Sequence, residues 1–126
     1  LSRGAAYCCF VELSRKTSTE ITKTLQNFGL EPSCYTVVTS DSRQFAKRFS
    51  IDSDQQYDLI FTDPPYKEKI VNPLFSMIVE NGILTHDGVF VAEHDVREKV
   101  IIPELYERSS SRLFGETEVD FFVLKE

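Results

Sequence analysis

The chain has 126 residues, of which 41% are hydrophobic and 27% charged, so it can bury one globular core. Five glycines and five prolines exclude collagen-like and low-complexity sequence, and no apolar run approaches the roughly 18 residues of a membrane-spanning helix. The formal net charge of −6 excludes a simple basic clamp for nucleic acid, although it still permits nucleic-acid chemistry at a small site.

The cysteines and histidines form no metal-ligand pattern. Cys8, Cys9 and Cys34 are odd in number and give no disulfide framework, which predicts reduced thiols in a cytoplasmic protein. His86 and His94 lie in different segments, without the spacing of metal ligands. The sequence therefore predicts no metal site, and it predicts no association with a membrane.

Apolar runs alternate with amphipathic stretches in the first half of the chain. A short apolar run of this kind is typical of a strand buried on both faces, and apolar residues three or four apart are typical of a helix. Ser14 is the candidate N-cap of the first helix, and Gly29 follows its end. The predicted elements are a strand over 5–11, a helix over 14–28, a strand over 34–39 and a short helix over 42–49.

The second half continues the alternation and ends differently. Two consecutive prolines, Pro64 and Pro65, stop a strand abruptly because they cannot continue a ladder. The predicted elements are a strand over 57–62, a helix over 70–79 that is regular from Asn72, turns at 81–82 and 87–88, a strand over 89–93, a partly helical segment over 96–106 and a hairpin of 108–114 with 117–124. This order predicts one α/β domain over 1–126, with a mostly parallel sheet covered by helices and a C-terminal antiparallel hairpin.

Acidic residues lie at the carboxyl ends of four of the predicted strands. In doubly wound sheets, ligands bind at the carboxyl ends of the strands, where Glu12, Asp41, Asp63 and Glu93 lie. Glu12 can accept hydrogen bonds from both hydroxyls of a ribose, or it is a charge favoured by the helix that begins just after it. Asp41 can bind an adenine amine, or it caps the helix that begins at Ser42.

The segment Asp63-Pro64-Pro65-Tyr66 carries the most specific signal. Its prolines fix the backbone, so the Asp63 carboxylate and a neighbouring carbonyl point to one place. The Tyr66 ring can stack on a planar base that has been turned out of its helix. An exocyclic amine held there would donate hydrogen bonds to Asp63 or to the Pro64 carbonyl, which increases the lone-pair density of its nitrogen for attack on an electrophilic methyl group. The alternative is a stiff loop with a buried tyrosine.

Together these motifs resemble a known family. The segments 10–12, 40–42 and 57–66 resemble successive motifs of S-adenosylmethionine-dependent methyltransferases. With the opening residues 1–5 and the Gly115-Glu116 hairpin, the chain resembles the RsmD-like family over essentially its whole length. That family methylates the exocyclic N2 amine of one guanine in small-subunit ribosomal RNA.

The resemblance implies a Rossmann-like class I methyltransferase fold, with S-adenosylmethionine as the cofactor. Glu12 would hold the cofactor ribose, Leu13 would pack on the adenine ring, and Asp41 would bind the adenine amine with the Ser42 backbone beside it. The implied methyl-acceptor residues are Asp63, Pro64, Pro65 and Tyr66. They would position ribosomal RNA, free or in an assembling small subunit, for direct methyl transfer without a covalent intermediate or a metal.

The chain departs from the family pattern in one respect. No Gly-x-Gly occurs in it, so the family's first strand and the glycine-rich loop that cradles the methionine part of the cofactor are absent. We therefore expect a portion of a longer enzyme, incomplete at its N-terminus, with a slot between the strands that end at Glu12 and Asp63. Three alternatives are an adenine-N6 methyltransferase acting on DNA or RNA, a catalytically inactive binding fragment, and an oxidoreductase with Glu12 on an NAD ribose.

Overall fold

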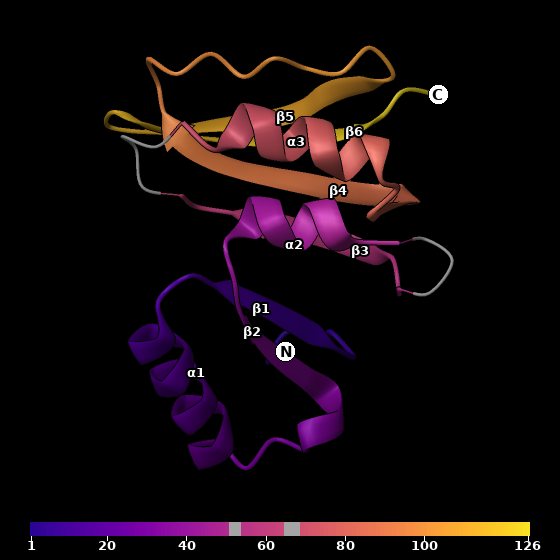
Figure 1. Ribbon diagram of the computed structural model, residues 1–126. Helices are drawn as coiled ribbons and strands as arrows, with labels where there is room; N and C mark the ends of the chain where they lie inside the picture. The colour runs from indigo at the N-terminus through magenta and orange to yellow at the C-terminus, as the bar shows by residue number, and fades with distance from the viewer. Residues whose placement is uncertain (51–53, 65–68) are drawn as a thin grey trace. The chain divides into compact units, whose positions relative to one another are not determined.

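The computed structural model describes residues 1–50, 54–64 and 69–126, which divide into two compact units, 1–45 and 46–126 (Figure 1). The elements are β1 (Cys8–Glu12), α1 (Arg15–Asn27), a short 3-10 helix η1 (Pro32–Cys34), β2 (Tyr35–Thr39), α2 (Ser42–Arg48), β3 (Tyr57–Thr62), α3 (Val71–Glu80), β4 (Leu84–Asp95), β5 (Tyr106–Phe114) and β6 (Thr117–Leu124). None of the helices in these ranges is long and apolar enough to cross a membrane.

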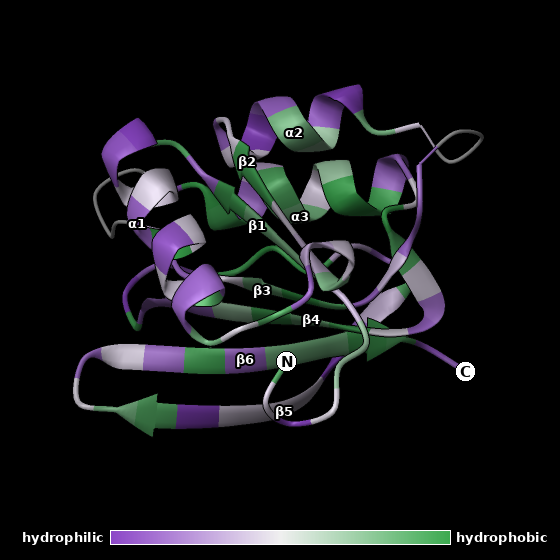
Figure 2. Ribbon diagram, turned by 90° about the horizontal axis from the view of Figure 1, so that it is seen from below, coloured by the Kyte–Doolittle hydropathy of each residue, from purple (hydrophilic) through white to green (hydrophobic). Residues whose placement is uncertain are grey.

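The first unit is built on one parallel strand pair. β1 and β2 pair in register from Cys8 opposite Tyr35 to Glu12 opposite Thr39, and α1 connects them. α1 buries only a narrow stripe of its surface. Most of this helix is drawn in the hydrophilic colours in Figure 2. The predicted strand–helix–strand order at the start of the chain is therefore confirmed.

The second unit contains a four-stranded sheet in the order β3-β4-β6-β5, packed against α3. β3 is parallel to β4, whereas β6 is antiparallel to both β4 and β5, so the predicted C-terminal hairpin is confirmed. Phe75 of α3 lies at the centre of the core, with its ring centroid 4.6 Å from that of Phe90 and 4.9 Å from that of Phe122. α3 turns this apolar face to the sheet, and Figure 2 shows it largely in the hydrophobic colour.

The sheets are mixed instead of mostly parallel, because two of the four strand pairings among the described residues are antiparallel. β1 and β2 form a sheet of their own, and no pairing in the described ranges joins it to the other four strands. The predicted slot between the strands that end at Glu12 and Asp63 stays a prediction.

The prediction of a partly helical segment over 96–106 is wrong. The segment is irregular, and the side chain of Asn72 from α3 satisfies part of its backbone. Asn72 Nδ2 donates to the carbonyl of Lys99 at 3.0 Å, and its Oδ1 accepts from the amide of Ile101 at 2.7 Å. These backbone groups therefore bond to Asn72 and not to a helical turn. Pro103 has no amide proton and cannot donate a helical hydrogen bond either.

The prediction of a turn at 87–88 is also wrong, because β4 extends through these residues. The register between β3 and β4 is irregular at this point, so the extra residues of β4 form a bulge. Gly88 fits there for a steric reason: a Cβ on it would lie 2.5 Å from Leu84 Cδ1 and 3.0 Å from the Thr85 carbonyl oxygen. Turn residues inside a strand pattern thus indicated a bulge instead of a strand end.

Candidate active site

Glu12 lies at the carboxyl end of β1, where the chain turns into α1. Its Oε1 accepts a hydrogen bond from the amide of Ser14 at 3.1 Å, and Ser14 Oγ in turn caps α1 by accepting from the amide of Thr17 at 3.2 Å. In the described part of the chain this is the only hydrogen bond of the Glu12 carboxylate, which leaves Oε2 as an acceptor. Leu13 beside it is 65% exposed and offers an apolar surface.

Asp41 lies at the same edge of this strand pair, because the amide of Ser40 donates to the carbonyl of Glu12 at 2.9 Å. Its Oδ1 accepts from the amide of Arg43 at 2.8 Å, and the Arg43 guanidinium bonds Oδ1 and Oδ2 at 3.2 and 3.1 Å. These hydrogen bonds from Arg43 hold the pKa of Asp41 below its usual value. Asp41 therefore caps α2, which begins at Ser42. A carboxylate offers about four positions that can accept a hydrogen bond, so one position on Oδ2 is still available.

The substitution Asp41→Ala tests this cap. It removes the oxygen that accepts from the first turn of α2, and we expect a loss of about 0.5 to 2 kcal/mol of unfolding free energy at neutral pH. Because the folded pKa of Asp41 is depressed, its contribution is complete above the unfolded pKa of about 3.9 and is lost as pH falls through the lower folded value. Urea unfolding of both proteins at pH 7 and in acid measures the effect.

The conservative variant Asp41→Asn separates the cap from the charge. Its side-chain oxygen still accepts from the helix amide, so we expect most of the stability at pH 7 and little change with acid. A difference between wild type and Asp41→Ala that stays constant down to strongly acidic pH would contradict the ionised cap.

Asp63 and Pro64 leave the sheet at the carboxyl end of β3. The parallel register places Thr62 opposite Ala92, so Asp63 leaves β3 beside Glu93. The prediction that Glu93 lies at a strand end is wrong, because β4 continues through it to Asp95, paired with β6. Asp63 is exposed and Glu93 is half-buried. This arrangement leaves the Asp63 carboxylate exposed just after the carboxyl end of β3. The other two predicted acceptor residues, Pro65 and Tyr66, lie outside the described residues.

The structure thus groups the predicted residues in two pairs. Glu12 and Asp41 share one sheet edge in the first unit, while Asp63 leaves β3 beside Glu93 of β4 in the second. A third group was missed: His94 of β4 lies against Glu118 and Asp120 of β6. Close spacing along the sequence does not reveal this group, because its carboxylates are on β6, which pairs with β4 from the end of the chain. The alternation of Glu118 and Asp120 on one strand was the available signal.

Comparisons with known proteins bear on this site. The model of a family described as "Conserved hypothetical protein 95" matches residues 1–123. The chain is 34% identical over 104 residues to the "Putative rRNA methyltransferase YlbH" of Bacillus subtilis, covering 82% of this chain and 54% of that protein. It is 26% identical over 104 residues to "Ribosomal RNA small subunit methyltransferase D" of Haemophilus influenzae, with 82% and 53% covered. The chain spans about half the length of these curated relatives.

Solved structures share the fold. A crystal structure named "putative methylase HI0767" from Haemophilus influenzae matches with a TM-score of 0.88 at 23% identity, over 99% of this chain and 76% of that one. The "SAH-bound Podospora anserina methyltransferase PaMTH1" matches with a TM-score of 0.73 at 12% identity, over 97% and 62%. Since the family model covers nearly all of the sequence, the chain belongs to the family described as Conserved hypothetical protein 95, the RsmD family, and the resemblance drawn from its motifs is confirmed.

Proposed function

We propose that this chain carries the methyl-acceptor site of an S-adenosylmethionine-dependent methyltransferase that modifies the exocyclic N2 amine of a guanine in small-subunit ribosomal RNA. The observation that carries the proposal is the Asp63-Pro64 strand end beside β4, in a chain that belongs to the RsmD family. The names of the Bacillus and Haemophilus relatives support ribosomal RNA as the substrate class.

The residues at the end of β1 and β2 fit the adenosine part of the cofactor. Glu12 has an acceptor oxygen for ribose hydroxyls, and exposed Leu13 can pack on an adenine ring. Asp41 keeps one acceptor position on Oδ2 for the adenine amine, with the first backbone amide of α2 at Ser42 beside it. When bound, S-adenosylmethionine supplies a methyl group activated by its positively charged sulfur.

In the proposed reaction, Asp63 acts on the amine of the target base. Its carboxylate accepts a hydrogen bond from one N–H, and the Pro64 carbonyl accepts from the other, so the nitrogen lone pair is held toward the methyl group. Formation of the new N–C bond would break the bond between the methyl carbon and the cofactor sulfur, leaving a neutral thioether, and the excess proton would leave the nitrogen for Asp63 or for solvent. The ring of Tyr66 stacks on the base and keeps it out of its helix.

These 126 residues contain no Gly-x-Gly, the pattern expected of the loop that would hold the methionine part of the cofactor. We propose that the complete cofactor site needs sequence beyond this chain. Cofactor binding is therefore measured both on this chain and on the protein at its natural full length. Binding of similar affinity by both would contradict this part of the proposal.

The substitution Glu12→Gln tests the cofactor assignment. It removes a charged acceptor of the ribose hydroxyls, and hydrogen bonds to charged groups contribute about 1.5 to 3 kcal/mol. We expect S-adenosylhomocysteine to bind roughly tenfold or more weakly by calorimetry in the full-length protein. The matched control is Glu20→Gln, an exposed carboxylate on α1, which should bind like wild type. Unchanged binding by Glu12→Gln would remove Glu12 from the cofactor site.

Transfer of labelled methyl groups from S-adenosylmethionine to small-subunit ribosomal RNA tests the activity itself. The proposal predicts incorporation into this RNA. Cofactor binding without any transfer to RNA or DNA would favour an inactive binding protein instead.

A further inference from the structure

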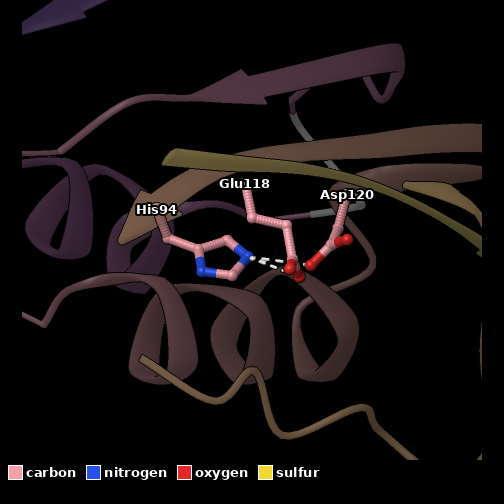
Figure 3. A group of neighbouring side chains, drawn as sticks. All are labelled: His94, Glu118 and Asp120. Carbon is pink, nitrogen blue, oxygen red and sulfur yellow. Dashed lines mark hydrogen bonds and ion pairs between the residues drawn. The ribbon is translucent and has the colours of Figure 1, made fainter. Parts of the chain in front are cut away.

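A polar cluster interrupts the apolar face on which the β4–β6 sheet packs. His94 of β4 lies directly opposite Glu118 of β6, and Asp120 is two residues further along β6 on the same face. His94 and Asp120 are 2% and 0% exposed, whereas the side chain of Glu118 is 23% exposed. Figure 3 shows the imidazole pointing toward both carboxylates. Such burial of three ionisable groups is costly unless their charges are compensated.

The hydrogen bonds of His94 define which nitrogen faces the carboxylates. Nδ1 lies 2.9 Å from the carbonyl oxygen of Asp95, which can only accept, so Nδ1 carries a proton and donates. Nε2 lies 2.8 Å from Oδ2 of Asp120 and 3.7 Å from Oε1 of Glu118. A neutral imidazole would therefore turn the Nε2 lone pair toward two anions. Arg108 offsets part of this negative charge from the far side of Asp120, and the hydrogen bond with Asp120 raises the pKa of Glu118. A proton or a metal ion between His94 and the carboxylates can compensate the rest.

We propose that His94, Glu118 and Asp120 form a binding site for a divalent transition-metal ion. One ligand atom from each residue lies within 4.8 Å of the others. A small shift of the partly exposed Glu118 side chain would bring all three within reach of a single ion. A histidine that donates its other nitrogen to a backbone carbonyl is the usual arrangement of a metal ligand, because this bond fixes the ring and its tautomer.

The surroundings of Asp120 support the same assignment. Its second oxygen, Oδ1, lies 3.3 Å from Nε of Arg108, and the Arg108 guanidinium carbon lies 5.8 Å from the centre of the Phe122 ring. Arg108 thus orients the carboxylate so that Oδ2 faces His94. The Asp120 carboxylate also accepts a hydrogen bond from the side chain of Ser111, which lies opposite it on β5. A ligating carboxylate held in this way by an outer partner is typical of metal sites.

The donor set indicates which ions fit. One imidazole nitrogen and two carboxylate oxygens suit Zn²⁺, Mn²⁺ or Fe²⁺, with water completing the coordination. Mg²⁺ loses its water reluctantly and prefers oxygen ligands in a regular octahedron. Because the ligands come from β4 and β6, a bound ion would fasten the C-terminal hairpin to the rest of its sheet. This inference does not depend on the proposed function.

The test titrates the chain with ZnCl₂ or MnCl₂ by calorimetry after treatment with a chelator, and follows Tm in the same solutions. Wild type should bind one equivalent of the ion in this site and show a higher Tm. Glu118→Gln has the same shape and one charged ligand fewer, and we expect it to bind at least about tenfold more weakly. The control is Glu116→Gln, which alters an exposed carboxylate two residues away and should behave like wild type.

The cysteines do not confuse this comparison, because Cys8, Cys9 and Cys34 are the same in all the variants. Asp120→Asn provides a second isosteric loss of a ligand and should weaken binding in the same way, with circular dichroism showing that the fold is kept. Equal binding by wild type and Glu118→Gln, or no binding by wild type, would overturn the proposal. His94 would then carry a proton on Nε2, in an ordinary buried ion pair with Asp120.

Discussion

Asp63→Ala is expected to reduce methyl transfer to ribosomal RNA by about 100- to 10,000-fold, the usual contribution of a group that moves a proton in the transition state. In the proposed reaction, the variant loses the carboxylate that holds the target amine. Because Asp63 is exposed, its unfolding free energy should change by no more than about 0.5 kcal/mol. Single-turnover methyl transfer by the full-length protein at saturating cofactor measures the chemical step.

The matched control is Asp58→Asn, another exposed aspartate of β3 at the opposite end of the strand, where Oδ1 accepts from Thr85 Oγ1 at 3.0 Å. It should transfer methyl groups like wild type. Cofactor affinity should also be unchanged in Asp63→Ala, since Asp63 is assigned to the base and not to the cofactor. Transfer within a few-fold of wild type by Asp63→Ala would remove Asp63 from the reaction.

Phe75→Ala is expected to reduce the free energy of unfolding by about 3 to 5 kcal/mol, the largest stability effect in the second unit. Phe75 is fully buried and its ring packs against Phe90, Phe122 and Tyr106, with the last ring centroid 5.7 Å away. Alanine removes the whole ring and leaves a cavity between α3 and the sheet. Urea unfolding followed by circular dichroism measures the loss.

The control for Phe75→Ala is its neighbour on the exposed face of the same helix. Ser76 Oγ donates to Glu80 Oε1 at 3.3 Å at the surface, so Ser76→Ala should change the unfolding free energy by no more than about 0.5 kcal/mol. A loss below about 1 kcal/mol in Phe75→Ala would show that Phe75 does not hold the centre of this core.

Local patterns in the sequence predicted the regular elements well. β1, β2, β3, α1 and α3 follow from apolar runs and helical spacing, and Pro73 lies in the first turn of α3 as expected. The errors come from tertiary contacts. The side chain of Asn72 hydrogen-bonds the backbone of 99–101, a contact that the sequence pattern does not reveal. The side chain of Leu84 occupies the space beside Gly88, so only a residue without a Cβ fits at this position of the bulge.

The site was predictable only where its residues follow strand ends. The topology of parallel strands placed Glu12, Asp41 and Asp63 at carboxyl ends, and the structure confirms that placement. Of the two open interpretations of Asp41, the helix cap is confirmed by the amide of Arg43, and binding of an adenine amine stays a prediction. The cluster around His94 depends on the pairing of β4 with β6, which is a long-range property that spacing along the chain does not contain.

The most direct test of the central claim is the identity of the methylated nucleoside. The full-length protein is incubated with S-adenosylmethionine and small-subunit ribosomal RNA that lacks this modification, and the RNA is digested to nucleosides and analysed by mass spectrometry. The account predicts N2-methylguanosine from wild type and none from Asp63→Ala. N6-methyladenosine as the product would contradict the assignment of the base, and the absence of any methylated nucleoside would contradict the proposed activity.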